Sequence, residues 1–469
     1  LSNATYPSST PGDCDDTDPE INSNAEEICG DGADNNCDGS VNGCGLSSPY
    51  SLGNVNTLFL GEFSKDYVGA ALTSGILLED SKDVVVAILA TGADSSIDDV
   101  GRIDIVGLED GTTILSDIET RIWGTEVSSF GSSMIGDQDL NGDENHDLLI
   151  GASYTTVDGN AGVGVVSVFL GPLQGEKTID DADYLFIGAN TNDRFGATAS
   201  IREDRQEVWV GAPNYDAPTI NAGAVFIFDI EDGAFQSNSS AIQISSEISS
   251  SRFGSSISSA ADANGDGVDD IAIGALGFNS SKGSAYVFWG EVSSGRSAQD
   301  ADVIVRGDEA SAEIGEKVDF AGDLTGSGYP ELVLASSNLD KLFLISASEA
   351  GEYLTADALI TIQGPADSSV GDSFENIGDF NGDGQDDFAI GGRIASTVYL
   401  LYGPLSGDYN LATDAVILQD TSDDQVGTSL TSVGDINGDG LSEFLIGAQI
   451  SSRNKFKSGT VFLVEGFGL

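Results

Sequence analysis

The apolar and polar positions of this chain form a short, repetitive pattern. Apolar runs of roughly four to six residues, rich in β-branched and aromatic side chains, alternate with turns rich in Gly, Asp, Asn and Ser. Such runs indicate strands rather than helices. Because polar residues rarely alternate within the runs, we expect both faces of each strand to be buried. The pattern predicts an all-β protein made of short, sandwiched strands.

An apolar residue followed by glycine recurs seven times, and each copy opens the same series of strands. The intervals between successive copies are 62, 65, 58, 61, 56 and 56 residues. Each unit continues with a strand of the type DIAIGA, a strand that opens with Gly, and a further apolar strand. The seven pairs are Val68-Gly69, Phe130-Gly131, Phe195-Gly196, Phe253-Gly254, Ile314-Gly315, Val370-Gly371 and Val426-Gly427.

These units predict a seven-bladed β-propeller with four strands in each blade. One such sheet cannot bury both faces alone, whereas seven sheets around an axis can. A β-sandwich or two stacked barrels would not explain seven nearly equal intervals. The last unit ends without a fourth strand, and residues 54–62 match the pattern of that strand. We expect this N-terminal strand to complete the last blade and close the ring, which removes a sheet edge.

The sequence divides the chain into three parts. We expect a Cys- and Asp-rich calcium-binding segment at 1–46, a linker at 47–53 and the propeller at 54–469.

Five of the seven units carry the same acidic turn before the second strand. In DINGDGLSE (435–443), oxygen side chains occupy positions 1, 3, 5 and 9, and glycine occupies position 4. In a tight loop these oxygens converge, the backbone carbonyl of position 7 joins them, and hard oxygen ligands in this number favour Ca²⁺. A plain hairpin turn would explain one copy but not five copies with the same positions filled.

The candidate calcium ligands are taken from positions 1, 3, 5, 7 and 9 of each loop. The loop at 323–331 is the weakest of the five, because Thr and Ser replace Asn and Asp there, whereas units one and three lack the loop. The ligands are Asp139, Asn141, Asp143, Asn145 and Asp147; Asp262, Asn264, Asp266, Val268 and Asp270; Asp323, Thr325, Ser327, Tyr329 and Glu331; Asp379, Asn381, Asp383, Gln385 and Asp387; and Asp435, Asn437, Asp439, Leu441 and Glu443.

The combination of Phe-Gly, D-x-N-G-D-G-x-x-D and IGA resembles FG-GAP repeats, the blades of the integrin α-subunit propeller, over about residues 54–469. The resemblance implies Ca²⁺ in the hairpin between the first and second strands of a blade, with all such hairpins on one face. Integrins usually load the later blades, whereas here the second blade also matches. Nothing corresponds to integrin leg domains, a membrane span or an inserted ligand-binding domain. This favours a bacterial or other stand-alone relative over a partner of an integrin β-subunit.

All four cysteines lie near the N-terminus, within a stretch that is rich in aspartate. An even number of cysteines in a short segment favours two disulfides and an exported protein, and three pairings remain open. A zinc site of four thiolates is the alternative, although no CxxC pair is present. The cysteines are Cys14, Cys29, Cys37 and Cys44.

Residues 13–39 resemble a short Cys- and Asp-rich metal-binding motif of bacterial surface proteins. One or more further Ca²⁺ ions are therefore expected here, although a simple acidic linker remains the alternative. The candidate ligands are Asp13, Asp15, Asp18, Asp34, Asn36 and Asp38.

The charge balance restricts the class of partner. The chain has 77 acidic and 18 basic residues and a net charge of −59, so clustered cations for a nucleic acid or an anionic membrane are lacking. Bound divalent cations or general adaptation of the surface to salt water would explain so much acid. No apolar run is long enough to span a membrane. We expect a secreted or cell-surface monomer.

A binding module is favoured over an enzyme. The only histidine, His146, lies at position 8 of a loop and is expected to face solvent, and no G-x-S-x-G or H-E-x-x-H motif occurs. A structural surface spacer, or an accessory domain of an enzyme whose catalytic part is absent, are the alternatives. A protein or glycan partner is expected on the face opposite the calcium loops. The candidate contacts are Tyr154, Tyr215, Phe278, Arg453, Lys455, Phe456 and Lys457.

Overall fold

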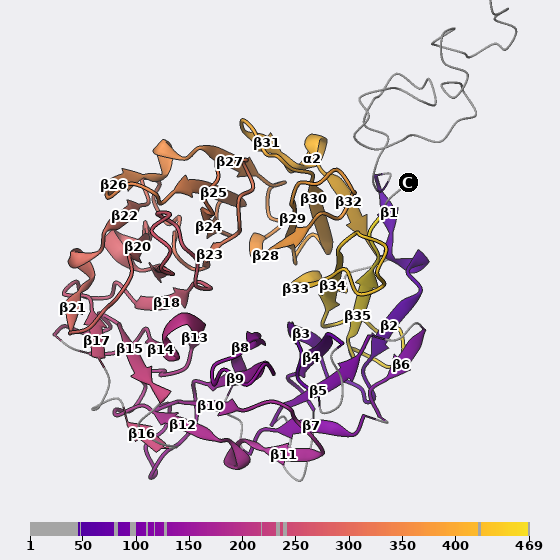
Figure 1. Cartoon of the computed structure of the whole chain (residues 1–469), viewed down its shortest axis with the longest axis horizontal. Coiled ribbons are helices and arrows are strands. Elements are labelled where there is room, and N and C mark those ends of the chain that lie inside the picture. The colour runs from indigo at the N-terminus through magenta and orange to yellow at the C-terminus, as the bar shows by residue number, and fades with distance from the viewer. Residues whose placement is uncertain are drawn as a thin grey trace, which may run out of the picture.

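Seven β-sheets stand around a common axis, and Figure 1 shows the ring viewed along that axis. The structure is a computed structural model that describes residues 46, 48–78, 83–93, 100–108, 111–116, 118–125, 129–216, 218–230, 235–237, 242–420 and 424–467. The chain runs once around the ring, so that each sequence unit forms one blade. The predicted all-β, seven-bladed propeller is confirmed.

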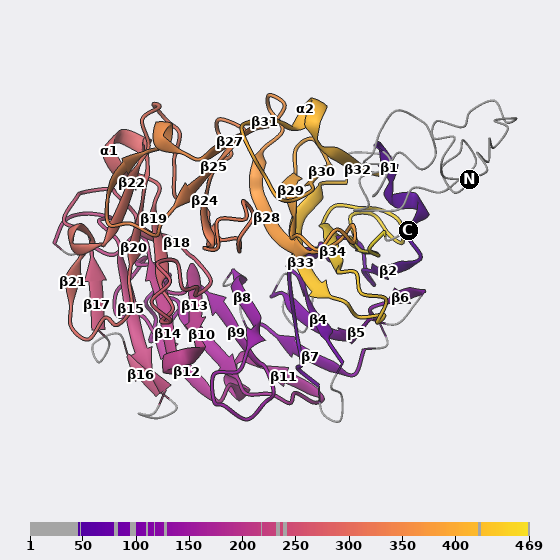
Figure 2. The same cartoon turned by 45° about the horizontal axis from the view of Figure 1, so that its top comes forward.

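Each blade contains four antiparallel strands that follow one another from the axis to the rim (Figures 1 and 2). In chain order, the blades are β3 (Val68–Gly75), β4 (Val85–Ala90), β5 (Arg102–Gly107) and β7 (Thr120–Trp123); β8 (Phe130–Gln138), β9 (Asp147–Ala152), β10 (Val165–Phe169) and β12 (Tyr184–Ile187); β13 (Thr198–Arg202), β14 (Glu207–Ala212), β15 (Ala224–Asp229) and β17 (Ile242–Ser245); β18 (Phe253–Ile257), β19 (Ile271–Ala275), β20 (Ser284–Phe288) and β22 (Val303–Arg306); β23 (Val318–Phe320), β24 (Glu331–Ser336), β25 (Lys341–Ser346) and β27 (Ile360–Gln363); β28 (Val370–Gly378), β29 (Asp387–Gly392), β30 (Thr397–Leu401) and β32 (Val416–Gln419); and β33 (Val426–Gly434), β34 (Glu443–Ala448), β35 (Thr460–Val464) and β2 (Thr57–Leu60).

Every sheet also has a fifth, parallel strand at its outer edge, which the four-strand expectation missed. For six of the blades, the connection between the third and fourth strands of the following blade supplies this strand, and for blade six the residues just before β2 supply it. It therefore covers an edge that would otherwise be open. These strands are β11 (Glu176–Thr178), β16 (Phe235–Ser237), β21 (Arg296–Ser297), β26 (Gly351–Leu354), β31 (Tyr409–Asn410), β1 (Tyr50–Ser51) and β6 (Thr112–Ile114), on blades one to seven in that order.

The ring closes in the way that the sequence predicts. Strand β2 pairs with β35 along its whole length, from Thr57 opposite Leu463 to Leu60 opposite Thr460. The segment that was expected to be a linker also belongs to the ring, because β1 pairs with β32 of blade six. Leu46 is buried in the same region, and its N–H donates to the Tyr402 hydroxyl at 3.0 Å. The propeller therefore begins before residue 54.

The two glycine motifs of the repeat meet at the interface between blades. A β-carbon at Gly274, in the IGA motif of blade four, would lie 2.0 Å from the carbonyl oxygen of Gly315, in the Ile-Gly pair of blade five. Only hydrogen fits there, and the Ser256 hydroxyl donates to the same carbonyl at 2.9 Å. Equivalent close contacts join Gly151 to Gly196, Gly211 to Gly254, Gly391 to Gly427 and Gly447 to Gly69. The regular recurrence of these glycines in the repeat is therefore a packing requirement between neighbouring blades.

The buried core follows this arrangement of neighbouring sheets. Each of the seven apolar clusters draws most of its side chains from two adjacent blades. The inner strands surround an axial cavity of about 360 Å³, lined in part by Lys317, Asp319 and Glu375. Small helices occur only in connections, for example α1 (Phe278–Ser281), α2 (Leu411–Asp414) and the 3-10 turn η3 (Glu203–Arg205).

Candidate metal loops and ligand face

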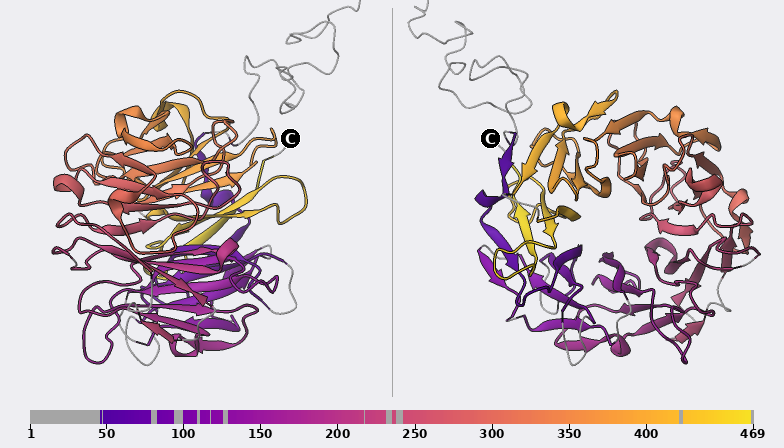
Figure 3. Two further views of the ribbon diagram at one scale, coloured as in Figure 1. Left: turned by 60° about the vertical axis from the view of Figure 1, so that its left-hand side comes forward. Right: turned by 180° about the vertical axis from the view of Figure 1, so that it is seen from behind.

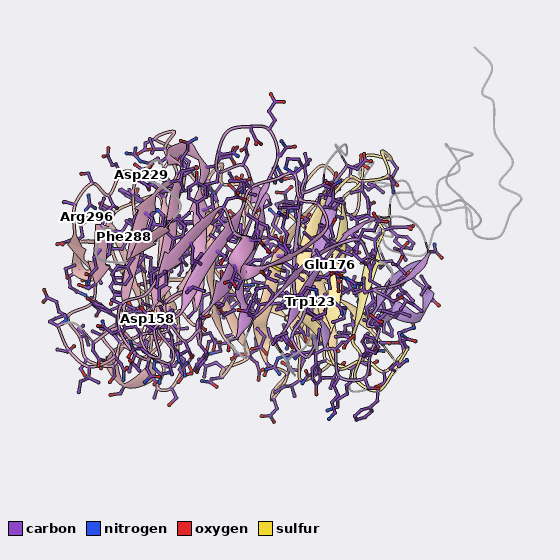
Figure 4. All side chains as sticks on the ribbon, turned by 90° about the horizontal axis from the view of Figure 1, so that it is seen from below. Trp123, Asp158, Glu176, Asp229, Phe288 and Arg296 are labelled. Carbon is purple, nitrogen blue, oxygen red and sulfur yellow. The ribbon has the colours of Figure 1, made fainter. Side chains whose placement is uncertain are left out.

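The five acidic loops lie in the hairpins between first and second strands, and therefore on one face of the ring. Because strand direction alternates, the loops between second and third strands lie on the other face. Figure 4 shows the ring edge-on, with Asp229, at the end of a third strand, and Asp158, in a loop between second and third strands, toward opposite faces. The left view in Figure 3 shows the ring obliquely from the side, with loops at both ends of the strands.

The loop of blade six illustrates how the backbone positions its oxygens. Oδ1 of Asp379 accepts hydrogen bonds from the N–H groups of Gly382 (2.7 Å) and Asp383 (3.0 Å), and Oδ2 accepts from Gly384 (2.9 Å). The two glycines have φ angles of +84° and +82°, which side chains rarely tolerate. Oδ1 of Asn381 accepts from the Asp383 N–H at 2.9 Å. The same bonds recur around Asp139, Asp262 and Asp435.

The carboxylate at position 9 lies at the start of the second strand and is buried in all five loops. In blade six, one oxygen of Asp387 accepts from the Phe380 N–H at 3.0 Å, and the other accepts from the Gly403 N–H at 3.0 Å. Gly403 follows the third strand, so three parts of the blade meet at this carboxylate. Gly171 and Gly290 hold Asp147 and Asp270 in the same way. The sequence showed these glycines only as strand ends, and their role as donors was missed.

The electrostatics of these carboxylates favour a bound cation. Burial, reinforced by the charges of Asp139 and Asp143, raises the pKa of Asp147 to about 6. Burial likewise raises the pKa of Asp270 to about 6 and that of Asp387 to about 7. Among the described residues, no Lys or Arg forms an ion pair with Asp147, Asp270 or Asp387. A divalent ion bound by these oxygens would remove both the desolvation cost and the repulsion.

The donor set of each loop fits a hard cation. The candidate ligands are carboxylate, amide, hydroxyl and carbonyl oxygens, with neither an imidazole nor a thiolate among them. Among the described residues, however, no group of three or more His, Cys, Asp or Glu side chains is placed so that it could hold a metal ion. In four of the loops, the first carboxylate accepts hydrogen bonds from N–H groups of its own loop.

The loop of blade five differs from the others, as the sequence predicts. Its position-3 and position-5 hydroxyls, Thr325 and Ser327, both donate to Oε1 of Glu331. The carboxylate is therefore satisfied by hydroxyl groups inside the loop. Tyr329 reaches the neighbouring loop, because a β-carbon at Gly265 would lie 2.5 Å from its Cε1 atom. This contact between loops was not predicted.

His146 does not simply face solvent. Its Nδ1 atom accepts a hydrogen bond from the Ile76 N–H at 3.2 Å, and its own backbone N–H donates to the Ile76 carbonyl at 3.0 Å. The side chain is half-buried against blade one. The expectation of a solvent-facing histidine was wrong, because these hydrogen bonds hold the loop of blade two against the first hairpin of blade one.

Blade three closes its first hairpin without an acidic loop. Strands β13 and β14 are joined by η3, and Arg202 is fully buried beside it. The Arg202 guanidinium donates to Asp204 at 2.9 Å and to the carbonyl of Gly290, in blade four, at 2.6 Å. Arg205 pairs with Glu291 at 3.2 Å. Protein cations therefore bridge to the next blade here.

The candidate partner contacts lie on the opposite face in different environments. Tyr154 is 41% exposed, and Arg194 lies 4.6 Å from its ring centroid. Phe278 is half-buried beneath Arg306. Tyr215 packs edge-on against Phe226, and Arg453 pairs with Asp420, so both contribute to packing within the propeller. Lys455 and Phe456 are exposed and Lys457 is half-buried.

The N-terminal candidates lie outside the described residues. These are the four cysteines and the six ligands proposed at Asp13, Asp15, Asp18, Asp34, Asn36 and Asp38. Their disulfides and metal binding remain predictions.

With this geometry established, comparison with known proteins identifies the repeat. Residues 253–288 match the FG-GAP repeat. The matched stretch covers the first three strands and the acidic loop of blade four. Each of the other six blades has the same type of acidic loop, the same glycine contact with a neighbouring blade, or both. Residues 13–42 match the metal-binding motif family named Cu-binding MopE.

The chain is also similar to integrin α-subunits. Over 168 residues it is 30% identical to human Integrin alpha-IIb, and the match covers 34% of this chain and 16% of that protein. Over 222 residues it is 29% identical to Integrin alpha-PS5 of Drosophila melanogaster, covering 45% of this chain and 21% of the relative. The chain therefore spans well under a quarter of the length of these relatives. Among the described residues, no helix is both long and apolar enough to cross a membrane.

Proposed function

We propose that this chain is an extracellular, calcium-dependent recognition module of the integrin α type, with an adhesive or ligand-binding role rather than a catalytic one. Calcium ions in the hairpin loops of blades two, four, six and seven, and more weakly in blade five, make one face rigid. The opposite face binds a protein or glycan partner. We further propose a secreted or cell-surface location.

One observation carries this proposal. In four loops, the same backbone N–H group donates to the carboxylate at position 1, and the carboxylate at position 9 is buried. Such repetition is expected if each loop binds the same ion, and a solvated turn would not need a buried carboxylate. Since the loops connect first to second strands, bound ions would fix the inner hairpin of each blade. A rigid inner hairpin holds the far loops in a constant arrangement.

Counting bound ions tests the calcium part directly. Native mass spectrometry of the full chain in calcium acetate should show four strongly held ions, with further ions held more weakly. The Asp387→Asn variant should lose one strong ion and leave the others in place. Saturation with fewer than two ions, or equal binding of the variant, would contradict the assignment.

A capture experiment tests the recognition part. Immobilised chain is exposed to glycan arrays and to extracellular extracts, in calcium and in chelator. A partner held only in calcium supports recognition by the metal-stabilised ring. The absence of any partner in either condition favours the structural spacer.

A further inference from the structure

A compact basic and aromatic surface lies where the ring closes, and we call it the closure patch. It consists of Phe63, Lys65, Lys455, Phe456 and Lys457. These residues come from opposite ends of the propeller sequence. The side chains project from two connections on the face opposite the acidic loops.

Backbone hydrogen bonds fix the two connections against each other. The Lys65 N–H donates to the carbonyl oxygen of Phe456 at 2.9 Å, and the Tyr67 N–H donates to that of Lys457 at 3.3 Å. Asn454 adds a side-chain bond to the carbonyl oxygen of residue 61 at 2.8 Å. The patch is therefore held on ordered backbone, which lowers the entropy cost of binding through it.

The patch exposes apolar rings and uncompensated cations together. Phe63 is 53% exposed and Phe456 is 61% exposed. Within the described part of the chain, none of the three lysines of the patch forms an ion pair, whereas neighbouring Arg453 is paired with Asp420. The Lys457 ammonium lies 5.8 Å from the Phe456 ring centroid. Charge and apolar area are thus both available to a ligand.

The Arg306–Phe278 pair on this face differs in that respect. Arg306 lies over the half-buried ring of Phe278 and also pairs with Glu352 at 3.3 Å. Its charge is therefore already used within the propeller. The closure patch is distinguished by lysines without such partners and by rings that are more than half exposed.

The charge of the rest of the molecule restricts what can occupy the patch. With a net charge of −59, the surface as a whole repels anions, and two copies of the chain repel each other. A long polyanion or an anionic membrane would extend beyond the patch onto acidic surface. A short acidic segment avoids that repulsion, and apolar residues between its carboxylates can cover the exposed rings.

We propose that the closure patch binds a short acidic peptide segment of a partner protein. Its carboxylates pair with Lys65, Lys455 and Lys457, and its apolar side chains pack on Phe63 and Phe456. This inference rests on the proposed function, because it requires the face opposite the acidic loops to be the ligand face. It specifies the chemistry of the partner, which that proposal leaves open.

Fluorescence anisotropy with synthetic peptides tests the inference on the full chain in calcium. The probe is a fluorescein-labelled peptide in which glutamate alternates with leucine. One comparison peptide carries glutamine in place of glutamate, and a second carries serine in place of leucine. We expect the first probe to bind at least tenfold more tightly than either comparison peptide, and we expect its binding to weaken as salt is raised (about 1.4 kcal/mol is tenfold).

Variants then locate the binding site. Phe456→Ala should weaken binding about tenfold, and the pair Lys455→Ala with Lys457→Ala should weaken it by a similar factor. Arg252→Ala is the matched control, because Arg252 is an exposed cation on the same face in another blade. It should change binding by less than about twofold.

Several outcomes would overturn the inference. These are equal binding of the glutamine peptide, an effect of Arg252→Ala equal to that of the lysine pair, or tighter lysine-dependent binding of heparin or phosphatidylserine vesicles. The number of bound calcium ions in each variant separates this failure from failure of the proposed function. A chain that loads calcium and captures a partner, yet ignores the peptide, contradicts only the inference about the patch.

Discussion

Blades three and four use different groups to connect their first and second strands. Blade four uses an acidic loop whose last carboxylate, Asp270, is buried and has its pKa raised to about 6 by burial. Blade three uses a 3-10 turn and a buried guanidinium, Arg202. The two solutions meet at Gly290, whose N–H donates to Asp270 and whose carbonyl accepts from Arg202. The two hairpins are thus held by different buried groups, a guanidinium in blade three and a carboxylate in blade four.

The buried carboxyl group of Glu375 avoids an uncompensated charge in a third way. Glu375 lines the axial cavity, and burial raises its pKa to about 8, with Lys317 opposing the rise and Asp319 adding to it. It therefore takes up a proton where the loops would take up calcium and blade three uses arginine.

Chelation should have the largest effect. A ligand present at a thousand times its dissociation constant stabilises the folded state by about 4 kcal/mol per site. Removal of ions from four or five loops should therefore lower the melting temperature by about 10 °C or more. Differential scanning calorimetry in calcium and in EDTA measures the shift. An unchanged melting curve would exclude calcium from the loops.

Removal of the buried cation of blade three should be costly irrespective of calcium. Arg202→Ala leaves the Gly290 carbonyl and Asp204 without their donor, and we expect a loss of about 3 kcal/mol in the free energy of unfolding. Asp262→Ala, in blade four, also removes the acceptor of three backbone N–H groups, so it should destabilise the protein in both conditions, but by more in calcium than in EDTA. Urea denaturation of both variants in calcium and in EDTA checks the contrast. If chelation reduced the effect of Arg202→Ala as well, the two blades would not be independent solutions.

The weak loop should become stronger when its missing carboxylate is restored. Ser327→Asp gives blade five the fifth-position ligand of the other loops, and its calcium affinity should rise about tenfold, because affinity in such loops depends on ligand charge. Asp383→Ser is the reciprocal control in blade six and should weaken that loop by a similar factor. Isothermal titration calorimetry measures both. No change in either variant would show that the fifth position does not bind the ion.

Glu375 should give a smaller dependence on pH. The folded chain holds a proton on this group between the usual value of 4.5 and about 8, whereas the unfolded chain releases it. Stability should therefore fall as pH rises through that window. Glu375→Gln should flatten the slope by at most about 1.4 kcal/mol per pH unit. Urea titrations in saturating calcium measure this slope, with Glu176→Gln as an exposed control. A slope that the Glu375 variant leaves unchanged would contradict the assignment.

The sequence was sufficient for the architecture because the decisive signals are repeated. Seven Gly pairs define the blades, and the same spacing places the acidic loops between the first and second strands. Even ring closure by residues 54–62 could be expected, since the last unit lacked a strand that the first part of the chain supplied. Repetition converts weak local signals into a strong one.

Features that depend on backbone contacts could not be predicted from the sequence, because no repeated residue type marks them. The fifth strands are two to four residues long and are held by backbone pairing at the rim, so they need no apolar pattern. The residue before each apolar-Gly pair adopts a left-handed backbone in all seven blades. Yet its identity ranges from Tyr67 to Arg194 and Gln425, so no residue type reveals it. The role of Arg202 depends on a carbonyl in the next blade, far away in sequence.

The strand that closes the ring also determines when the ring can form. The hairpins within blades join residues close in sequence, whereas β2 must find β35 across nearly the whole propeller, with Thr57 opposite Leu463. Loop closure over such a separation is entropically costly, and contacts of this kind slow folding. We therefore expect the blades to assemble in succession and β2 to dock last. The closure patch, which needs both ends in place, would then be present only on molecules that have finished folding.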